Sequence, residues 1–299
     1  MKIIIAANKT LPRNGKQELD TGMSYLYQPL TELGHEVYFY DTIKPAEPDF
    51  DLVTQIFLPD LVFCCFTGNS FMTPYEPWPS ILRLTKTTKI TTFNWFCDDT
   101  WRFDNFSSKA CWSFDHCSTP EPSFVSRFKD IGYENIHLAN WHANSDCYST
   151  MLKDIDISFA GDITLARKQF FSTCKVPIVN SGGLSIDELF NFYCRSRIGV
   201  NLSVNVNDPE KKTQMKQRVF ELAAAGCLVL SEYTPGIEDF FELDKEIVTF
   251  SGVEEFEKKV TYLLENPDVV EKVATAGHER FLKDHESKVR LKTLLEKII

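Results

Sequence analysis

The sequence has no long hydrophobic run, no Cys-x-x-Cys pair and no net positive charge, and each absence excludes a class of protein. The apolar segment 3–7 is too short for a signal peptide or a membrane span, so we interpret it as a buried strand and expect a cytoplasmic protein. The nine cysteines lack the paired spacing of zinc and thioredoxin sites, which indicates free thiols in a reducing compartment. The formal charge of −10 argues against a general nucleic-acid binder, although it leaves room for a local basic groove.

What the sequence does have is a repeated alternation of short apolar runs with longer amphipathic stretches. Its 299 residues are enough for about two domains, and 43% hydrophobic with 25% charged residues is typical of a globular protein. Continuously apolar runs indicate strands that are covered on both faces, hence parallel sheets. Each half of the chain has five predicted strands: 2–7, 36–40, 61–66, 90–96 and 135–140, then 157–160, 177–180, 198–202, 227–230 and 247–250.

The predicted fold class is therefore α/β, with two doubly wound, Rossmann-like domains at residues 1–150 and 151–299. Ser185 and Glu188 have the spacing of a capping box, which predicts a helix start. Ligands of open α/β sheets bind beyond the carboxyl ends of the strands, so we expect the two domains to face each other across a ligand-binding cleft. The predicted helices are 18–33, 79–85, 122–131, 166–173, 185–196, 214–225, 253–265 and 269–282.

The segment 216–232 combines the end of a helix with the strand that follows it. Gly226 is expected to end the helix in the left-handed conformation, which glycine adopts without steric cost. Arg218 and Glu221 are three residues apart and share one helix face. A carboxylate and several cations at a helix start suit the ribose and phosphates of a nucleotide, whereas a solvated amphipathic helix is the alternative. Three lysines lie near the start of this predicted helix: Lys211, Lys212 and Lys216.

Several segments resemble one family of enzymes. The stretch 218–226, Arg-Val-Phe-Glu-Leu-Ala-Ala-Ala-Gly, resembles the group 1 glycosyltransferases with the GT-B fold. Among these the chain is most similar to the branch that includes the spore maturation protein CgeB. The resemblance covers most of the chain and is strongest over 195–285. The other segments that carry it are 96–103, 132–141, 157–161, 238–250, 262–267 and 276–280.

This resemblance implies transfer of a sugar from a UDP-, GDP- or TDP-linked donor to an acceptor hydroxyl of a glycan, a protein or a small molecule. Glu221 is implied to bind the donor ribose, while Lys216 and Arg218 neutralise the diphosphate, whose negative charge grows as its bond to the sugar breaks. Enzymes of this fold usually need no divalent ion, so the resemblance implies no metal and no cofactor. The chain departs from the family at Thr213, eight residues before Glu221, where many members carry another glutamate.

Further donor-binding candidates follow the predicted strands of the second domain. A glycine at position 161 lets backbone approach phosphate groups, although glycines after strands also serve as plain turns. Arg167, on the next predicted helix, is a candidate phosphate ligand, with a solvated side chain as the alternative. The remaining candidates come after later strands: Gly182, Gly183, Ser203 and Asn205.

Three residues are candidates for acid–base chemistry. Asp98 and Asp99 follow the strand 90–96, where a carboxylate could accept the proton of the acceptor hydroxyl or simply cap a helix. His142, near the expected junction of the two domains, could act as a base near neutral pH or be structural.

Three alternatives to this function stay open. A phage-type glycosyltransferase acting on modified DNA bases has the same architecture, although the acidic net charge counts against it. A GT-B-like binding or assembly subunit without catalysis is compatible with Thr213 in place of the missing glutamate. A nucleotide-sugar epimerase on the same fold is the third.

Overall fold

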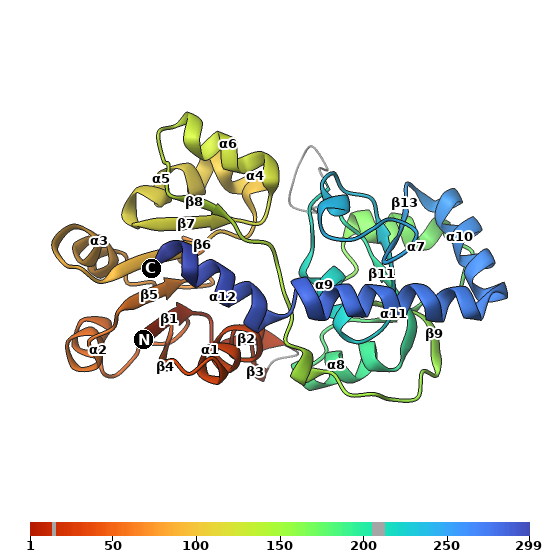
Figure 1. The fold of residues 1–299 in the computed structure, drawn as a ribbon, viewed down its shortest axis with the longest axis horizontal. Helices are drawn as coiled ribbons and strands as arrows, with labels where there is room; N and C mark the ends of the chain where they lie inside the picture. The colour runs from red at the N-terminus through yellow and green to blue at the C-terminus, as the bar shows by residue number, and fades with distance from the viewer. Residues whose placement is uncertain (14–15, 205–212) are drawn as a thin grey trace. The chain divides into compact units, whose positions relative to one another are not determined.

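The computed structural model describes residues 1–13, 16–204 and 213–299, and the chain forms two compact units (Figure 1). The first unit consists of Met1–Asn140 together with Ser287–Ile299, and the second is Trp141–Glu286. No helix in the described part of the chain is long and apolar enough to cross a membrane.

The compact units divide at residue 140, ten residues before the predicted division. The segment after residue 140 is bonded to the second unit: the Trp141 indole donates to the backbone oxygen of Met215 over 3.1 Å, and Ala143 pairs with Glu286. The last helix, α12 (Ser287–Ile298), belongs to the first unit, whereas the predicted second domain, 151–299, included it. Four of its apolar side chains are buried: Leu291, Leu294, Leu295 and Ile298.

The first unit is built on a six-stranded sheet in which every neighbouring pair is parallel. Its core strands carry continuous apolar runs, and Ile3, Ile4 and Ile5 are fully buried because both sheet faces are covered. The strand order is β4 (Glu36–Asp41), β1 (Lys2–Ala7), β5 (Leu61–Cys64), β6 (Thr91–Trp95), β7 (His116–Thr119) and β8 (Ile136–Leu138). The helices are α1 (Gln28–Glu32), α2 (Phe50–Phe57), α3 (Trp78–Thr87), α4 (Asp99–Arg102), α5 (Ser108–Ala110) and α6 (Pro122–Asp130), besides α12.

The second unit has a five-stranded sheet that is also parallel throughout. The strand order is β10 (Val179–Ser181), β9 (Ile155–Ala160), β11 (Ser196–Asn201), β12 (Leu228–Glu232) and β13 (Val248–Phe250). The helices are α7 (Leu165–Thr173), α8 (Ile186–Cys194), α9 (Gln217–Ala224), α10 (Val253–Glu265) and α11 (Pro267–Asp284). The α/β class and the parallel sheets predicted from the apolar runs are confirmed.

Two local predictions are also confirmed. Ser185 caps α8 with the reciprocal bonds of a capping box, since its side chain accepts from the Glu188 amide and Glu188 accepts from the Ser185 amide. Gly226 ends α9 in the left-handed region at φ 65°, and the Cys227 amide donates back to the Leu222 oxygen over 3.0 Å. This wrap-back bond satisfies a helix carbonyl at the point where the chain turns into β12.

Several elements differ from the sequence prediction. The predicted helix 18–33 begins later, because residues 16–19 form strand β3 and pair with β2 (Thr10–Arg13) as a hairpin. The helix predicted at 214–225 starts only at Gln217, since the Gln214 amide donates to the Ser203 oxygen over 2.9 Å and keeps the preceding segment out of the helix. Strand β7 and helix α2 were not among the predicted elements.

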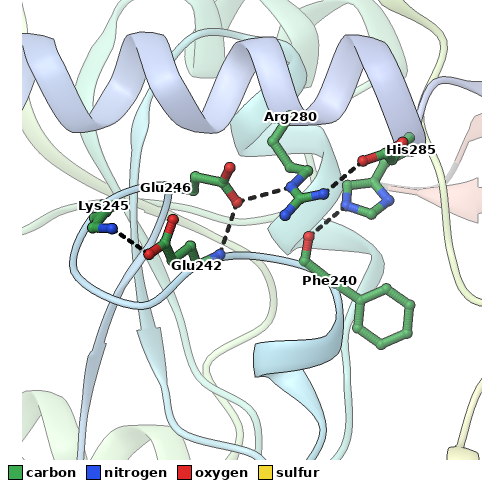
Figure 2. A network of polar contacts seen from close by, with 7 residues as sticks. Phe240, Glu242, Lys245, Glu246, Arg280 and His285 are labelled. Carbon is green, nitrogen blue, oxygen red and sulfur yellow. Dashed lines mark hydrogen bonds and ion pairs between the residues drawn. The ribbon is translucent and has the colours of Figure 1, made fainter.

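Helix α11 is held to the loop before β13 by a network of polar contacts (Figure 2). The Glu246 carboxylate accepts from the Arg280 guanidinium over 2.9 Å and from the Glu242 amide over 2.7 Å. The ring of His285 lies 2.8 Å from the Phe240 backbone oxygen. A Cβ on Gly277 would lie 2.3 Å from the Glu246 oxygen, so only glycine permits this close approach of helix and loop. The network has a structural role, because it fixes helix α11 against the loop before β13 in the second unit.

Candidate functional site

The site predicted from the sequence lies at the carboxyl ends of the strands of the second unit. Parallel strands all end at this edge, so the residues after β9, β11 and β12 are brought together there although they lie far apart in the sequence. Helix α9 starts at the same edge, with Lys216 as its N-cap residue.

Arg218, in the first turn of α9, ties this edge together. Its Nε donates to the Ala160 oxygen at the end of β9 over 2.9 Å, and its Nη1 donates to the Asn201 side chain at the end of β11 over 3.1 Å. The guanidinium also lies 4.7 Å from the centre of the Phe159 ring, a cation–π contact. The side chain predicted to face a diphosphate is therefore fixed in place at the strand ends.

Gly161 occupies the space between two arginines. A Cβ at this position would lie 2.7 Å from Nη2 of Arg218 and 3.4 Å from Nη1 of Arg167, and its φ of 143° also disfavours a side chain. Only glycine therefore lets the backbone pass between the two guanidinium groups. Position 161 therefore requires a glycine for a steric reason, and the approach of its backbone to phosphate groups stays a prediction.

Arg167, on α7, points its charge at the same place. Its guanidinium lies 5.4 Å from the Phe159 ring centre, and its Nη1 donates to the Asp162 backbone oxygen over 2.8 Å. Burial and, to a smaller extent, the neighbouring charge of Arg218 lower the pKa of Arg167 to about 10, while Asp162 and Glu232 oppose the shift. Arg167 remains cationic at neutral pH, so two half-buried positive charges are held close together, an arrangement that an anion stabilises.

Glu221 lies one turn along α9 from Arg218 and is only 6% exposed. The Tyr193 hydroxyl, on α8, lies close to both side chains: burial raises its pKa, the Glu221 carboxylate raises it further, and Arg218 acts in the opposite direction. The carboxylate predicted to bind a ribose is thus within the same small cluster as the arginines.

Glu232, the last residue of β12, belongs to this edge and was missed by the sequence analysis. Its carboxylate accepts from the backbone amides of Ser203 and Val204 over 2.8 and 3.0 Å, and its backbone oxygen accepts from the Ser203 hydroxyl over 2.8 Å. Asn201 in turn donates to the Ser203 hydroxyl over 3.0 Å. Glu232 therefore anchors the start of the segment that follows β11. The sequence pattern that could have identified Glu232 is a carboxylate that comes directly after an apolar strand.

The other donor-side candidates lie along the same edge. Gly183 has φ 68°, whereas a Cβ on Gly182 would meet its nearest neighbour, the Gly161 oxygen, at an ordinary 3.5 Å. Ser203 is fully buried in the network with Glu232, so it supports the backbone there. Asn205, Lys211 and Lys212 lie outside the described residues.

The acid–base candidates of the first unit follow β6. Asp98 is half-buried at the start of α4, and its side chain makes no capping bond to the helix. Asp99 is fully buried, and burial raises its pKa to about 6, while the hydroxyls of Ser107 and Thr119 oppose this shift. Asp99 is therefore enclosed by its own unit, and Asp98 is the more accessible of the two carboxylates.

His142 is almost completely buried. It is 3% exposed and lies in the second unit, in the segment tied down by Trp141 and by the pairing of Ala143 with Glu286. Within the described ranges, no group of three histidine, cysteine, aspartate or glutamate side chains is placed to hold a metal ion. A cavity of about 780 Å³ in the second unit lies elsewhere, at the amino ends of the strands beside Asp156 and Arg197.

The Glycosyl transferase-like family model matches residues 147–296, half of the chain, and the protein belongs to this family. The structure is similar to HepE from Anabaena in complex with UDP and glucose, with a TM-score of 0.65 over 99% of this chain and 98% of that one at 9% identity. It is similar to sucrose-phosphate synthase from Thermosynechococcus elongatus, with a TM-score of 0.66, the same coverage and 9% identity.

A third similar structure is an alpha-glucosyltransferase in complex with UDP and DNA containing an HMU base, with a TM-score of 0.65 over 100% of this chain and 99% of that one at 12% identity. At these identities the similarities establish the fold, and they confirm the predicted GT-B architecture. No curated protein sequence matches the chain. The CgeB-like branch stays a prediction.

Proposed function

We propose that the protein transfers a sugar from a nucleotide diphosphate sugar, with the donor bound by the second unit at the carboxyl ends of its strands. The observation that carries this proposal is the pair of guanidinium groups, Arg167 and Arg218, on either side of Gly161. Two half-buried cations beside open backbone form a site for a diphosphate. UDP or UDP-glucose is named in the HepE and alpha-glucosyltransferase structures, which makes uridine nucleotides the first donors to test.

Each side chain has a proposed task in the transfer. Arg167 has a single described hydrogen bond, to a backbone oxygen, and is the better placed of the two arginines to contact phosphate. Arg218, which is fixed by Ala160 and Asn201, adds positive potential behind it, and Lys216 adds a third charge at the helix start. Glu221 binds the ribose hydroxyls. These fixed cations stabilise the charge that develops on the departing diphosphate, so we propose that no metal ion is required.

The acceptor side of the reaction belongs to the first unit in this proposal. The acceptor hydroxyl loses its proton as its oxygen bonds to the anomeric carbon, and Asp98 is the proposed proton acceptor because its side chain is the more accessible carboxylate. Asp99 and His142 remain candidates for the same task, although both are almost completely buried.

Nucleotide binding tests the donor site directly. Thermal unfolding is measured with UDP, GDP, TDP, ADP and CMP, and one of the diphosphates is expected to stabilise the protein by about 2.7 kcal/mol at a hundredfold excess over Kd. Arg167→Ala and Glu221→Gln are expected to lose most of this response. The matched controls, Arg197→Ala at the opposite edge of the sheet and Glu265→Gln on the exposed end of α10, are expected to keep it. Equal responses in all four variants would refute the proposed site.

The alternatives are separated by two further measurements. Slow hydrolysis of the donor without acceptor is expected of an active transferase, whereas a binding subunit would bind nucleotide and leave the donor intact. The alpha-glucosyltransferase with bound DNA favours a DNA acceptor, and the net charge of −10 opposes it. A salt-sensitive shift of duplex DNA would favour that acceptor, and indifference to DNA would exclude it.

A further inference from the structure

The loop between β5 and α3 in the first unit is uncharged and lies where ligands of such sheets bind. Residues 67–75, Thr-Gly-Asn-Ser-Phe-Met-Thr-Pro-Tyr, contain no Asp, Glu, Lys or Arg, in a chain in which a quarter of the residues are charged. β5 ends at Cys64 and pairs in parallel with β6, so this loop leaves the sheet at the same edge as Asp98. It is therefore a neighbour of the proposed acceptor-side carboxylate within one unit.

The loop is fixed from within by a single carboxylate. Glu76 accepts hydrogen bonds from the amides of Thr67 and Gly68 over 2.6 and 3.0 Å, from the Thr73 hydroxyl over 2.7 Å and from the Trp78 indole over 2.9 Å. These bonds join both ends of the loop to its last turn. The carboxylate of Glu76, the residue that follows the loop in the sequence, is thus used to hold the shape of the loop.

A second set of contacts fixes the tip and base of the loop. The Asn69 side chain accepts from the amides of Phe71 and Met72 over 3.1 and 3.2 Å, which sets the turn at the tip. At the base, Gly68 lies against the Phe106 ring, where a Cβ would come within 2.3 Å, and Arg102 donates to the Thr67 oxygen. The backbone of the loop is therefore determined at each end and in the middle.

This fixed loop directs three large side chains into solvent. Phe71 is 95% exposed, Met72 is 50% exposed and Tyr75 is 42% exposed. Exposing Phe71 forgoes the stabilisation that burying its ring would bring. A rigid loop that presents apolar and aromatic side chains next to hydroxyl and amide groups is preorganised to bind a ligand.

We propose that residues 67–75 bind the neutral carbohydrate part of the acceptor, with the Phe71 ring stacked on a sugar face. The inference rests on the proposed function and extends it to the class of acceptor. A sugar ring has an apolar C–H face and a rim of hydroxyl groups, and the loop offers the matching aromatic ring and polar groups without charge. Anionic acceptors, including DNA and acidic lipid surfaces, are disfavoured because the loop has no cation and the chain is acidic.

The experiment uses the full chain with labelled methionine methyl groups and three neutral probes: maltotriose, cellotriose and chitotriose. Met72 is one of five methionines, and its methyl signal is assigned with Met72→Leu. At least one probe is expected to shift this signal in a saturable way. Phe71→Ala is expected to weaken that binding at least tenfold, and Phe71→Trp to retain it. The control Ile56→Ala, an equally apolar and 67% exposed position on α2, is expected to leave it unchanged.

Parallel UDP titrations separate this inference from the proposed function. UDP affinity is expected to be the same in the wild type and in all the loop variants. If UDP binds but no trisaccharide shifts Met72, or if Phe71→Ala binds the trisaccharide as well as the wild type, the loop inference is wrong and the donor site stands. Binding of the loop to anionic vesicles, or concentration-dependent dimerisation that Phe71→Ala abolishes, would also overturn it. Failure of every nucleotide to bind would refute the proposed function instead.

Discussion

The two units share one architecture and differ in what they place at the carboxyl ends of their strands. The second unit gathers Arg167 and Arg218 around the backbone of Gly161, with Glu221 one turn further along α9. The first unit has an uncharged loop with an exposed Phe71 and a carboxyl group, Asp99, whose pKa is raised to about 6 by burial. The parallel sheet therefore sets where a ligand can bind, and the segments after the strands determine which chemistry it meets. Removing a charged side chain should consequently lower the stability of the protein at the edge of the second unit and raise it at the edge of the first.

The largest effect is expected from Arg218→Ala in the second unit. The substitution leaves the Ala160 oxygen and the Asn201 side chain without their charged donor, so we expect the second unit to lose about 2–4 kcal/mol of stability and the protein to lose its response to nucleotide. Arg218→Lys keeps the charge but cannot donate to both acceptors as the guanidinium group does. It should therefore recover only part of the stability and part of the nucleotide response. Thermal unfolding with and without UDP measures the two effects. An Arg218→Ala variant that is as stable as the wild type and still binds UDP would contradict the proposed role of Arg218 at the strand ends of the second unit.

Replacing the carboxylate of Asp99 in the first unit by a neutral side chain should instead increase the stability of the protein. The pKa of Asp99 is raised from 3.8 to about 6 in the folded protein, so the folded state holds its proton more tightly and loses stability as the pH rises from about 4 to about 6. Two units of pKa correspond to about 3 kcal/mol. Asp99→Asn is therefore expected to be more stable than the wild type at pH 7.5, by up to that amount, and to lose this advantage at pH 4. A variant that is less stable than the wild type at pH 7.5 would contradict the role of burial.

A smaller effect is expected from Gly161→Ala. The new Cβ would lie 2.7 Å from the Arg218 guanidinium at a φ of 143°, which costs about 1–3 kcal/mol and displaces the arginine. UDP affinity should fall at least tenfold by calorimetry. The matched control is Gly182→Ala, whose Cβ has its nearest neighbour at 3.5 Å and whose φ is not in the left-handed region. Similar losses in both variants would show that the glycines act only as turns.

The smallest effect is expected from Glu232→Gln. The amide oxygen of glutamine can still accept from Ser203 and Val204, but without the negative charge these bonds weaken by about 1 kcal/mol in total. Because Glu232 acts through the backbone, we expect KM for the donor to rise several-fold while kcat changes little. A fall in kcat at unchanged KM would instead place Glu232 in contact with the reacting groups.

The sequence predicted the fold better than it predicted the site. Apolar runs predict strands such as Lys2–Ala7 and Leu228–Glu232 from the local sequence alone. The end of helix α9 was predicted in the same way, because Gly226 adopts the left-handed conformation that ends a helix. Strand β7, His116–Thr119, is too polar to be recognised, and it is a strand only because β6 and β8 pair with it on both sides.

The site depended on contacts between distant segments. Arg218 and Glu221 were identified as candidates because they are three residues apart in the sequence and share one helix face. The proximity of Arg218 to Arg167 joins positions 51 apart in the sequence, and the anchoring of Ser203 by Glu232 joins positions 29 apart, so no local pattern encodes either contact. The burial of Asp99 follows from the packing of the first unit around α4, so its sequence neighbour Asp98, identical in chemistry, has a different exposure.

The chain passes from the first unit to the second and back once, at residues 140 and 286. A polypeptide shortened at Glu286 would lack α12 and expose the surface that its buried leucines cover, so it should aggregate even though every strand is intact. Residues 141–286, in contrast, lose nothing of their own sheet when produced alone, and their two ends are already paired through Ala143 and Glu286. The second unit, which we propose binds the nucleotide, is in this sense a self-contained module, and exchanging it between relatives is expected to change the donor while leaving the sheet of the first unit whole.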